Sequence, residues 1–369
     1  MAPLAILLLV RETTHSYAAA GIAVGAFALA TASMAPLQGR LVDRFGRMRV
    51  LLPSGISQGL VLVSLVLAAR GHAPSVVLVL LSGLAGSLLP PIAATVRALL
   101  REVVQDPGVR ETAYALESVA QELIWITGPL VVALVITVAS PTGAVLLLAA
   151  VCIGGTIAFV RSPLVRERPI RAHGHERTPA LANARLRALL GPIALTGMGL
   201  GAVEVGLPSL ALHTGSRWAS GLLLALWSAG SVAGGLWYGA RSWASPLAAR
   251  YQTLLLVAVA CPAPLIAARS IPAGIVGSLL AGLAIAPMFS CQYALVGRVV
   301  SHGSETETFT WVASALVAGL AAGSAAGGAV IGAGGVGAPF VLACASTAVA
   351  AALATRVRAT AKELVEPAA

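Results

Sequence analysis

Residues 39–50 read GRLVDRFGRMRV, a charged segment between two long apolar runs. One acid, Asp43, and two glycines, Gly39 and Gly46, are interleaved with four basic residues, Arg40, Arg44, Arg47 and Arg49. The apolar run on each side has about 20 residues, which is long enough for a membrane helix. The segment therefore predicts a short polar turn between two antiparallel membrane helices.

The composition supports a membrane protein. Hydrophobic residues make up 58% of the 369-residue chain and charged residues 10%, and the mean hydropathy is +0.90. A soluble domain carries roughly a quarter charged residues. So much apolar surface is expected to face lipid, and the lipid bilayer is the first partner that the sequence predicts.

Apolar runs of membrane length recur along the whole chain. We expect eleven full-length helices, at 17–38, 50–69, 74–100, 112–137, 141–160, 188–212, 218–240, 250–268, 272–297, 308–333 and 338–355. The stretch 2–10 is too short to cross alone, because a helix rises about 1.5 Å per residue. We interpret it as the outer half of a first helix that is truncated at its N-terminus.

The basic residues predict the orientation in the membrane. If the turn at 39–49 is cytoplasmic and the helices alternate, all of the 24 lysines and arginines lie on the cytoplasmic side except Arg11, Arg70, Arg217 and Arg269. This bias is typical of multi-pass proteins of the cell (inner, cytoplasmic) membrane, and it predicts a cytoplasmic C-terminus. The arginines lie in short breaks and form no stripe, so the net charge of +10 does not indicate a nucleic-acid partner.

One long polar segment divides the chain. It spans 161–187 and predicts a basic cytoplasmic linker between an N-terminal bundle, 1–160, and a C-terminal bundle, 188–355, with a cytoplasmic tail at 356–369. His173 and His175 lie in this linker without further ligands nearby, so we expect no metal site.

The two halves resemble each other weakly at an offset of about 196–200 residues. LLSGLAG at 80–86 matches LLAGLAI at 279–285, and Glu111-Thr112 recurs as Glu307-Thr308. The charged turn itself, GRLVDRFG, is matched by GLWYGARS at 235–242, where most of the charge is lost. Repeats of this kind mark one class of secondary transporter.

The pattern G-x-L-x-D-R-x-G-R between the second and third helices resembles the signature of the major facilitator superfamily. It is filled here by Gly39, Leu41, Asp43, Arg44, Gly46 and Arg47. The resemblance covers the helix number, the charged linker and the two related halves. It implies an all-α membrane protein with two six-helix bundles related by a pseudo-two-fold axis, and a monomer.

In that family the loop aspartate helps to latch the two bundles together on the cytoplasmic side. The resemblance implies that Asp43 contacts the start of a helix near Thr308, with Arg97 or Arg101 as its partner. The alternative is that these charges only fix the topology. That alternative explains the arginines but not the aspartate, because the positive-inside bias requires no acid.

Ionisable residues inside the apolar spans are the candidates for function, because they are costly in hydrocarbon. Arg97 and Glu117 lie at similar depth in neighbouring spans with opposite charge, so we expect an ion pair with a gating or structural role. Glu122 lies about ten residues, or roughly 15 Å, into its span, and Glu204 about sixteen residues into its own.

Glu122 and Glu204, one in each predicted bundle, are the leading candidates for proton transfer or cation recognition. The alternative is that each carboxyl is satisfied by hydroxyl or carbonyl neighbours. Polar and aromatic residues that could complete a substrate cavity are Gln121, Trp125, Gln292 and Tyr293. For these four the alternative is ordinary packing.

Residues 127–130 read TGPL, and drug/proton antiporters of the family carry a Gly-Pro motif in this helix. Gly128 and Pro129 fit, but VVA follows where a glycine pair is expected, so the match is partial. The small residues at 319–335 are interpreted as helix-packing positions.

No nucleotide-binding loop is found, and the single lysine, Lys362, lies in the tail. H-E-x-x-H does not occur, and G-x-S-x-G occurs only at residues 55–59, inside a predicted membrane span, so we expect no enzyme, no catalytic residue and no cofactor. The predicted function is proton-coupled efflux of a small, partly apolar or cationic compound by alternating access. The alternatives are proton-coupled uptake of a small organic solute and a transporter-like sensor or non-functional truncated paralogue.

Overall fold

The computed structural model describes residues 2–166, 178–216, 218–301 and 303–362. Within these ranges it is all-helical, and eleven helices or helix pairs are long and apolar enough to cross a membrane, which confirms the predicted class. Their bounds are Tyr17–Phe45, Arg47–Arg70, Ser75–Val103, Pro107–Val138, Pro141–Arg161, Ala184–His213, Ala219–Gly239, Leu247–Ile266, Ile271–Val299, Glu305–Gly332 and Ala338–Thr355. His173 and His175 fall outside the described residues.

Internal contacts divide the chain into two units. Unit 1 contains residues 1–96, 125–178 and 301–314. Unit 2 contains residues 97–124, 179–300 and 315–369. Three helices contribute residues to both units: α5 (Ile92–Val103), α6 (Pro107–Val138) and α15 (Glu305–Gly334).

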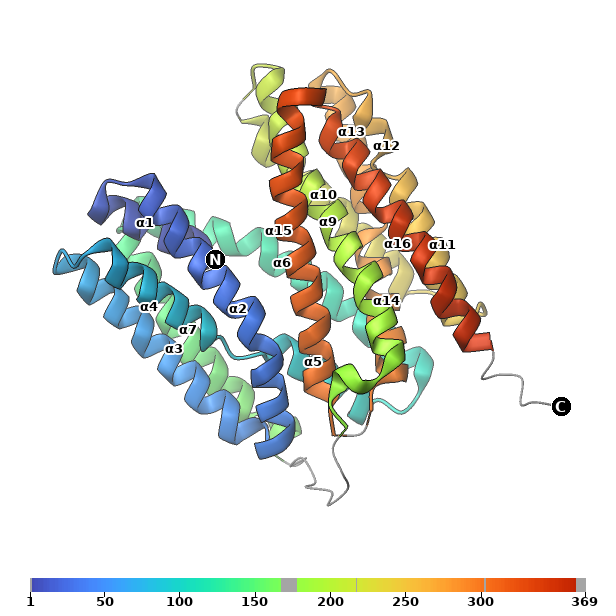
Figure 1. Cartoon of the computed structure of the whole chain (residues 1–369), viewed down its shortest axis with the longest axis horizontal. Coiled ribbons are helices and arrows are strands. Elements are labelled where there is room, and N and C mark those ends of the chain that lie inside the picture. The colour runs from blue at the N-terminus through green and yellow to red at the C-terminus, as the bar shows by residue number, and fades with distance from the viewer. Residues whose placement is uncertain (1, 167–177, 217, 302, 363–369) are drawn as a thin grey trace. The chain divides into compact units, whose positions relative to one another are not determined.

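Unit 1 is built from the first helices of the chain. They are α1 (Ala2–Thr14), α2 (Tyr17–Phe45), α3 (Arg47–Arg70), α4 (Ser75–Ser87), α7 (Pro141–Arg161) and the short α8 (Pro163–Arg166). Helix α2 packs against α4 and α1, and α3 packs against α7 (Figure 1). Small and aliphatic side chains such as Ala23, Leu65, Val66 and Ala144 form its core.

The charged segment at 39–50 does not interrupt the helical structure as a loop would. Helix α2 continues to Phe45, and α3 begins at Arg47, so Gly46 alone separates them. Its φ of 96° lies in the region that favours glycine, and its N–H donates to Val42 O at 2.9 Å. The predicted span 17–38 therefore ends too early, because the polar residues beyond the apolar run are still part of helix α2.

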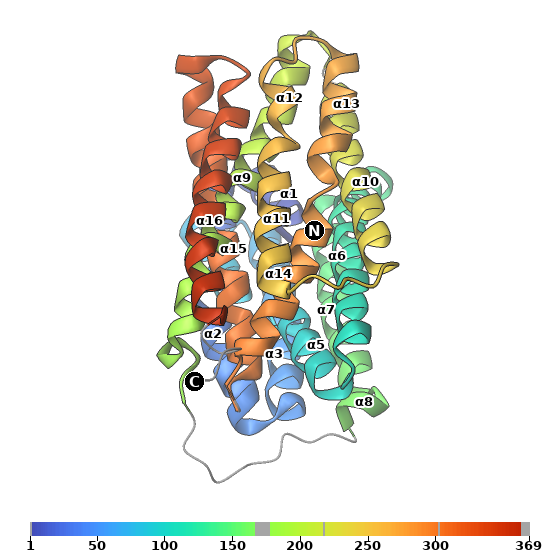
Figure 2. The ribbon, with the colours of Figure 1, turned by 90° about the vertical axis from the view of Figure 1, so that its right-hand side faces the viewer.

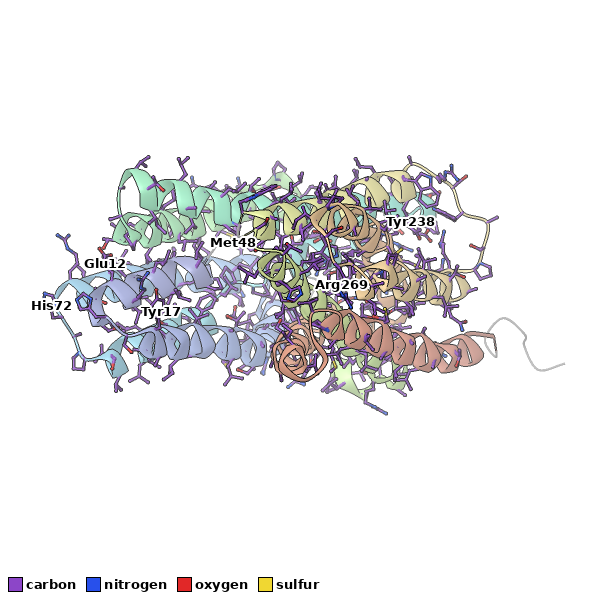
Figure 3. The ribbon with its side chains drawn as sticks, turned by 90° about the horizontal axis from the view of Figure 1, so that it is seen from above. Glu12, Tyr17, Met48, His72, Tyr238 and Arg269 are labelled. Carbon is purple, nitrogen blue, oxygen red and sulfur yellow. The ribbon has the colours of Figure 1, made fainter. Side chains whose placement is uncertain are left out.

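At the other end of unit 1, two connections between helices each contain a histidine with a positive φ. His15 joins α1 to α2 with φ 54°, and His72 lies between α3 and α4 with φ 52°. Figure 3 shows Glu12, Tyr17 and His72 gathered at this end. The Arg11 guanidinium lies 4.4 Å from the centroid of the Tyr17 ring.

The predicted span 74–100 is broken into α4 and α5 at Leu88–Pro91. Prolines have no N–H to donate, so Pro90 and Pro91 leave the carbonyls of Gly86 and Ser87 without their usual helical partners. Side chains of α2 donate hydrogen bonds to these two carbonyls instead. Gln38 donates to Ser87 O at 2.5 Å, and Thr31 donates to Gly86 O at 3.1 Å.

Unit 2 contains the remaining helices. They are η1 (Ala180–Ala182), α9 (Ala184–His213), α10 (Ala219–Gly239), α11 (Leu247–Ala260), α12 (Ala263–Ile266), α13 (Ile271–Gly282), α14 (Ile285–Val299) and α16 (Ala338–Lys362). Helix α16 packs against α9 and α11, and α10 packs against α13 (Figure 2). Two predicted spans are again broken beside a proline, at Pro262 and just before Pro287.

Glycines hold α9 and α15 together. A Cβ added at Gly197 or Gly201 would overlap the backbone carbonyls of Leu316 and Leu320, and one added at Gly319 or Gly323 would overlap those of Ala194 and Met198. The predicted packing role of the small residues of α15 is thus seen in the described structure.

Candidate functional site

The Asp43 carboxylate lies at the start of α15. Its Oδ1 accepts the N–H of Thr306 at 3.0 Å and its Oδ2 accepts the N–H of Glu307 at 2.8 Å. The first N–H groups of a helix have no intrahelical partner and carry the positive end of its dipole. An ionised carboxylate with both oxygens bound there is held by charge-assisted hydrogen bonds, and Asp43 is only 3% exposed.

The resemblance implies that this contact lies near Thr308. The hydroxyl of Thr308 instead donates to Ser304 O at 2.7 Å, within its own helix. The N–H groups that bind Asp43 belong to Thr306 and Glu307, the two residues that precede Thr308. They lie in the first turn of α15, where an N–H group has no helical carbonyl to donate to.

Gly39 allows α2 to approach α15 closely. A Cβ there would lie 2.5 Å from Thr310 Oγ1 and 2.9 Å from Glu307 Cα. One residue on, Arg40 forms an ion pair with Glu307, with Nε 3.5 Å from Oε2; the Glu307 side chain is buried while Arg40 is half exposed. The remaining members of the motif are Arg44, which is exposed and stacks on Phe45, and Arg47, which is buried.

Arg97 and Glu117, which the sequence predicts to pair, form a two-pronged ion pair in unit 2. Arg97 Nη2 lies 2.8 Å from Glu117 Oε1, and Arg97 Nε lies 3.1 Å from Oε2. The guanidinium also stacks 3.9 Å from the centroid of the Tyr293 ring. Arg97 is 4% exposed, so this is a buried pair whose disruption would leave an uncompensated charge.

Arg101 lies one turn further along α5, and its side chain contacts the backbone of α14. Its Nε donates to Gly297 O at 2.7 Å. Tyr114 packs between the same two helices, and its ring centroid lies 6.4 Å from that of Tyr293. The side chains of α5, α6 and α14 therefore form one polar and aromatic cluster in unit 2.

Glu122 and Glu204 are both half-buried in unit 2. Glu122 of α6 lies beside the Ser231 hydroxyl of α10. The side chain of Glu204 of α9 makes no hydrogen bond or ion pair with any residue in the described ranges, and neither carboxylate has an arginine or lysine partner there. Both are therefore acids without a fixed counter-charge in the described structure.

The other predicted cavity residues lie in different surroundings. Gln292 is fully buried and accepts from the Tyr251 hydroxyl at 3.3 Å, and Tyr293 is buried in the Arg97 cluster. Gln121 is half-buried, whereas Trp125 is 61% exposed. Gly128 and Pro129 lie inside the continuous α6, with Gly128 buried and Pro129 exposed.

A second buried ion pair, which the sequence does not predict, joins α6 to α11. Glu111 Oε2 of α6 lies 2.7 Å from Arg250 Nη2 of α11, and Arg250 is 6% exposed. Its guanidinium lies 5.6 Å from the centroid of the Tyr238 ring and 5.7 Å from that of Trp243. The signal for Glu111 was the repeated Glu-Thr pair; nothing in the sequence pointed to Arg250 as its partner.

Solved structures of three membrane transporters match this fold over nearly the whole chain. The human organic anion transporter MFSD10 aligns with a TM-score of 0.72 at 20% identity, covering 91% of this chain and 83% of its own. A bacterial homologue of the iron transporter ferroportin in its outward-facing state aligns at 0.70 with 12% identity, covering 97% and 98%.

The E. coli fucose:proton symporter FucP also aligns at 0.70 with 12% identity, covering 96% of this chain and 97% of its own. At these identities the likeness shows the fold alone. The comparison with curated proteins gives no match. The sequence model of the Major Facilitator Superfamily matches residues 1–268, well over half of the chain. The chain therefore belongs to the Major Facilitator Superfamily, and it is a multi-pass secondary transporter of a small molecule rather than an enzyme.

Proposed function

We propose that the protein exports a small, partly apolar or cationic compound in exchange for protons by alternating access. The observation that carries this proposal is the pair of half-buried carboxylates, Glu122 and Glu204, which have no cationic partner among the described residues. An acid without a counter-charge in an apolar surrounding can take up a proton or attract a cation. The Gly128–Pro129 pair in α6 favours exchange over uptake.

The same proposal gives the Asp43 contact a mechanical role. Two hydrogen bonds from Thr306 and Glu307 hold the turn between α2 and α3 against the start of α15. We expect this contact to latch the cytoplasmic side and to break in each transport cycle, with the buried Arg97–Glu117 pair gating the same side.

The arginine distribution supports a cell (cytoplasmic) membrane location with the turn at Gly46 and the C-terminus in the cytoplasm. We further propose a monomer that moves as two six-helix bundles, residues 1–160 and 188–355, joined by the linker 161–187. The sequence repeat between the two halves supports this division.

Inside-out vesicles test the coupling. Vesicles containing the full chain and an acidified lumen are given the lipophilic cation tetraphenylphosphonium or ethidium, and accumulation is followed together with the lumenal pH. We expect accumulation of at least one probe, with a loss of the pH gradient upon its addition. Glu122→Gln and Glu204→Gln should each lower pH-driven accumulation at least about tenfold, because a neutral amide carries no proton at these sites.

Exchange of labelled for unlabelled probe without a pH gradient separates coupling from binding. This exchange should continue in a variant if the replaced carboxylate carries only the proton and does not bind the probe. Glu12→Gln is the matched control, since Glu12 is exposed and lies at the end of α1. Normal pH-driven transport in both Glu122→Gln and Glu204→Gln would exclude them as coupling sites.

A further inference from the structure

A cavity of about 600 Å³ lies in unit 2 where the start of α6 meets the segment between α10 and α11. Its walls are the first residues of α6, the non-helical link Ala240–Pro246, the start of α11 and the end of α14. Its charged lining residues are Glu111, Arg241, Arg250 and Arg298. Three guanidinium groups thus face one carboxylate.

Arg250 has more donors than this wall supplies with acceptors. Its Nη2 pairs with Glu111, but its Nε and Nη1 are buried and have no hydrogen-bond partner in the described structure. The thiol of Cys291 lies beside it and is only a weak acceptor. A buried charged donor without a partner is costly, so the wall is short of acceptor oxygens.

The other two arginines add positive charge without an acid to balance it. Arg298 is exposed and forms no ion pair or side-chain hydrogen bond with the residues that the structure describes. Arg241 stacks 4.6 Å from the centroid of the Trp237 ring and likewise has no carboxylate partner there. Trp243 is fixed in the wall, because its Nε1 donates to Tyr238 O at 3.1 Å.

The related charged turn in unit 1 fills the corresponding place with its own acid. In the repeat, GRLVDRFG at 39–46 is matched by GLWYGARS at 235–242, which puts Gly239 in the position of Asp43. The link that follows Gly239 carries Arg241 but no acid up to Pro246. The second turn therefore keeps the basic surroundings and lacks the anion.

We propose that this cavity binds a phosphate group, either the headgroup of an anionic phospholipid or a soluble phosphate compound. Arginine presents a planar fork of donors that matches phosphate oxygens, and a dianion or diester would supply the acceptors that Arg250 lacks. The volume suits a headgroup or a small organic phosphate rather than a bare ion. Basic pockets on the cytoplasmic side of membrane proteins are suited to such headgroups.

Thermal unfolding of the full-length protein tests the proposal with two probes. In detergent without added lipid, potassium phosphate is titrated against potassium chloride at equal ionic strength. In a separate arm, the protein is placed in nanodiscs of phosphatidylcholine with increasing phosphatidylglycerol. Arg298→Gln removes an unpaired charge, and Ala240→Asp adds an acid at an exposed position of the cavity wall.

The control is Arg269→Gln. Arg269 is also exposed in unit 2, but it does not line the cavity, and it donates to its own backbone at Ile266 O and Ala268 O. Phosphate stabilises many proteins nonspecifically, so only the difference between variants counts. We expect the apparent dissociation constant to rise at least about tenfold in Arg298→Gln and Ala240→Asp and to be unchanged in the control.

Stabilisation by phosphate in detergent without stabilisation by phosphatidylglycerol would identify a soluble phosphate compound as the ligand, and stabilisation by phosphatidylglycerol alone would identify a lipid. Either result supports the site if it is lost in the two cavity variants. Equal responses in all proteins, or no response to either probe, would overturn the proposal. Because Arg298 and Ala240 are exposed, neither variant is expected to impair folding.

Discussion

The two turns that are related by the sequence repeat, α2–α3 and α10–α11, differ in length and in charge. Between α2 and α3 the link is the single residue Gly46, and Asp43 binds the backbone at the start of α15. Between α10 and α11 the link is seven residues long, and no acid stands at the matching position. There the side chain of Thr112, in the first turns of α6, donates to Gly239 O at 3.3 Å.

The long helix that each turn contacts, α15 for the first turn and α6 for the second, carries the same Glu-Thr pair, but its glutamate pairs with a different arginine. Glu307 pairs at 3.5 Å with the half-exposed Arg40 from the turn itself. Glu111 pairs at 2.7 Å with the buried Arg250 of α11. The repeated motif thus supplies the acid but not its partner, and the second turn, which lacks the aspartate, borders a basic cavity.

The largest effect is expected where the pair is buried. Glu111→Gln leaves the Arg250 charge enclosed without a carboxylate, and breaking such a pair costs about 3 kcal/mol or more. Thermal unfolding in detergent should show this loss. In a double-mutant cycle, Arg250→Met should recover part of the stability in the Glu111→Gln background, and simple additivity would contradict the pairing.

The next effect concerns close packing at the first turn. Gly39→Ala should cost about 1–3 kcal/mol, because its Cβ meets backbone atoms of α15 that cannot move independently. Gly25→Ala is the control on the same helix, since nothing lies within 4 Å of that position. A loss of stability that is equal in the two variants would show that the α2–α15 approach is not tight.

The Asp43 contact should be worth less than either. Asp43→Asn keeps one acceptor oxygen but removes the charge and the second acceptor, so we expect a loss of about 1–2 kcal/mol. Asp106→Asn is the matched control, because Asp106 caps its own helix by accepting from Val109 N at 2.9 Å, and asparagine caps equally well. Equal losses would argue that the Asp43 charge is unimportant.

The smallest effect should come from the exposed pair. Arg40→Gln should cost at most about 1 kcal/mol, because water and salt screen a half-exposed arginine. The loss should shrink further as the salt concentration is raised from 0.05 to 0.5 M, a range chosen for the assay. A loss as large as that of Glu111→Gln would remove the contrast between the two turns.

The membrane spans could be predicted because the apolar run itself is the signal. All eleven were found, but their ends and breaks were not. Helix α2 extends through the charged residues to Phe45, and α6 begins five residues before the predicted start at 112. Hydropathy reports the residues that suit hydrocarbon, whereas a helix continues into water as long as its backbone bonds allow.

The contacts within the candidate site were less predictable. The resemblance pointed Asp43 towards the start of α15, but the two N–H groups that bind it follow from the helix boundary, which sequence leaves uncertain. Arg97 and Glu117 could be paired because their depths match. Glu111 and Arg250 are separated by 139 residues, and nothing in the sequence indicates that the start of α6 and the start of α11 lie side by side.

The glycine seam between α9 and α15 has a thermodynamic consequence for a transporter. Where Gly197, Gly201, Gly319 and Gly323 meet the opposing carbonyls, main chain touches main chain. Forming or shifting such a seam freezes no side-chain rotamers, so it carries none of the entropy that longer residues would lose. The two helices can therefore pack closely in this register without the entropy cost of ordering long side chains at their contact.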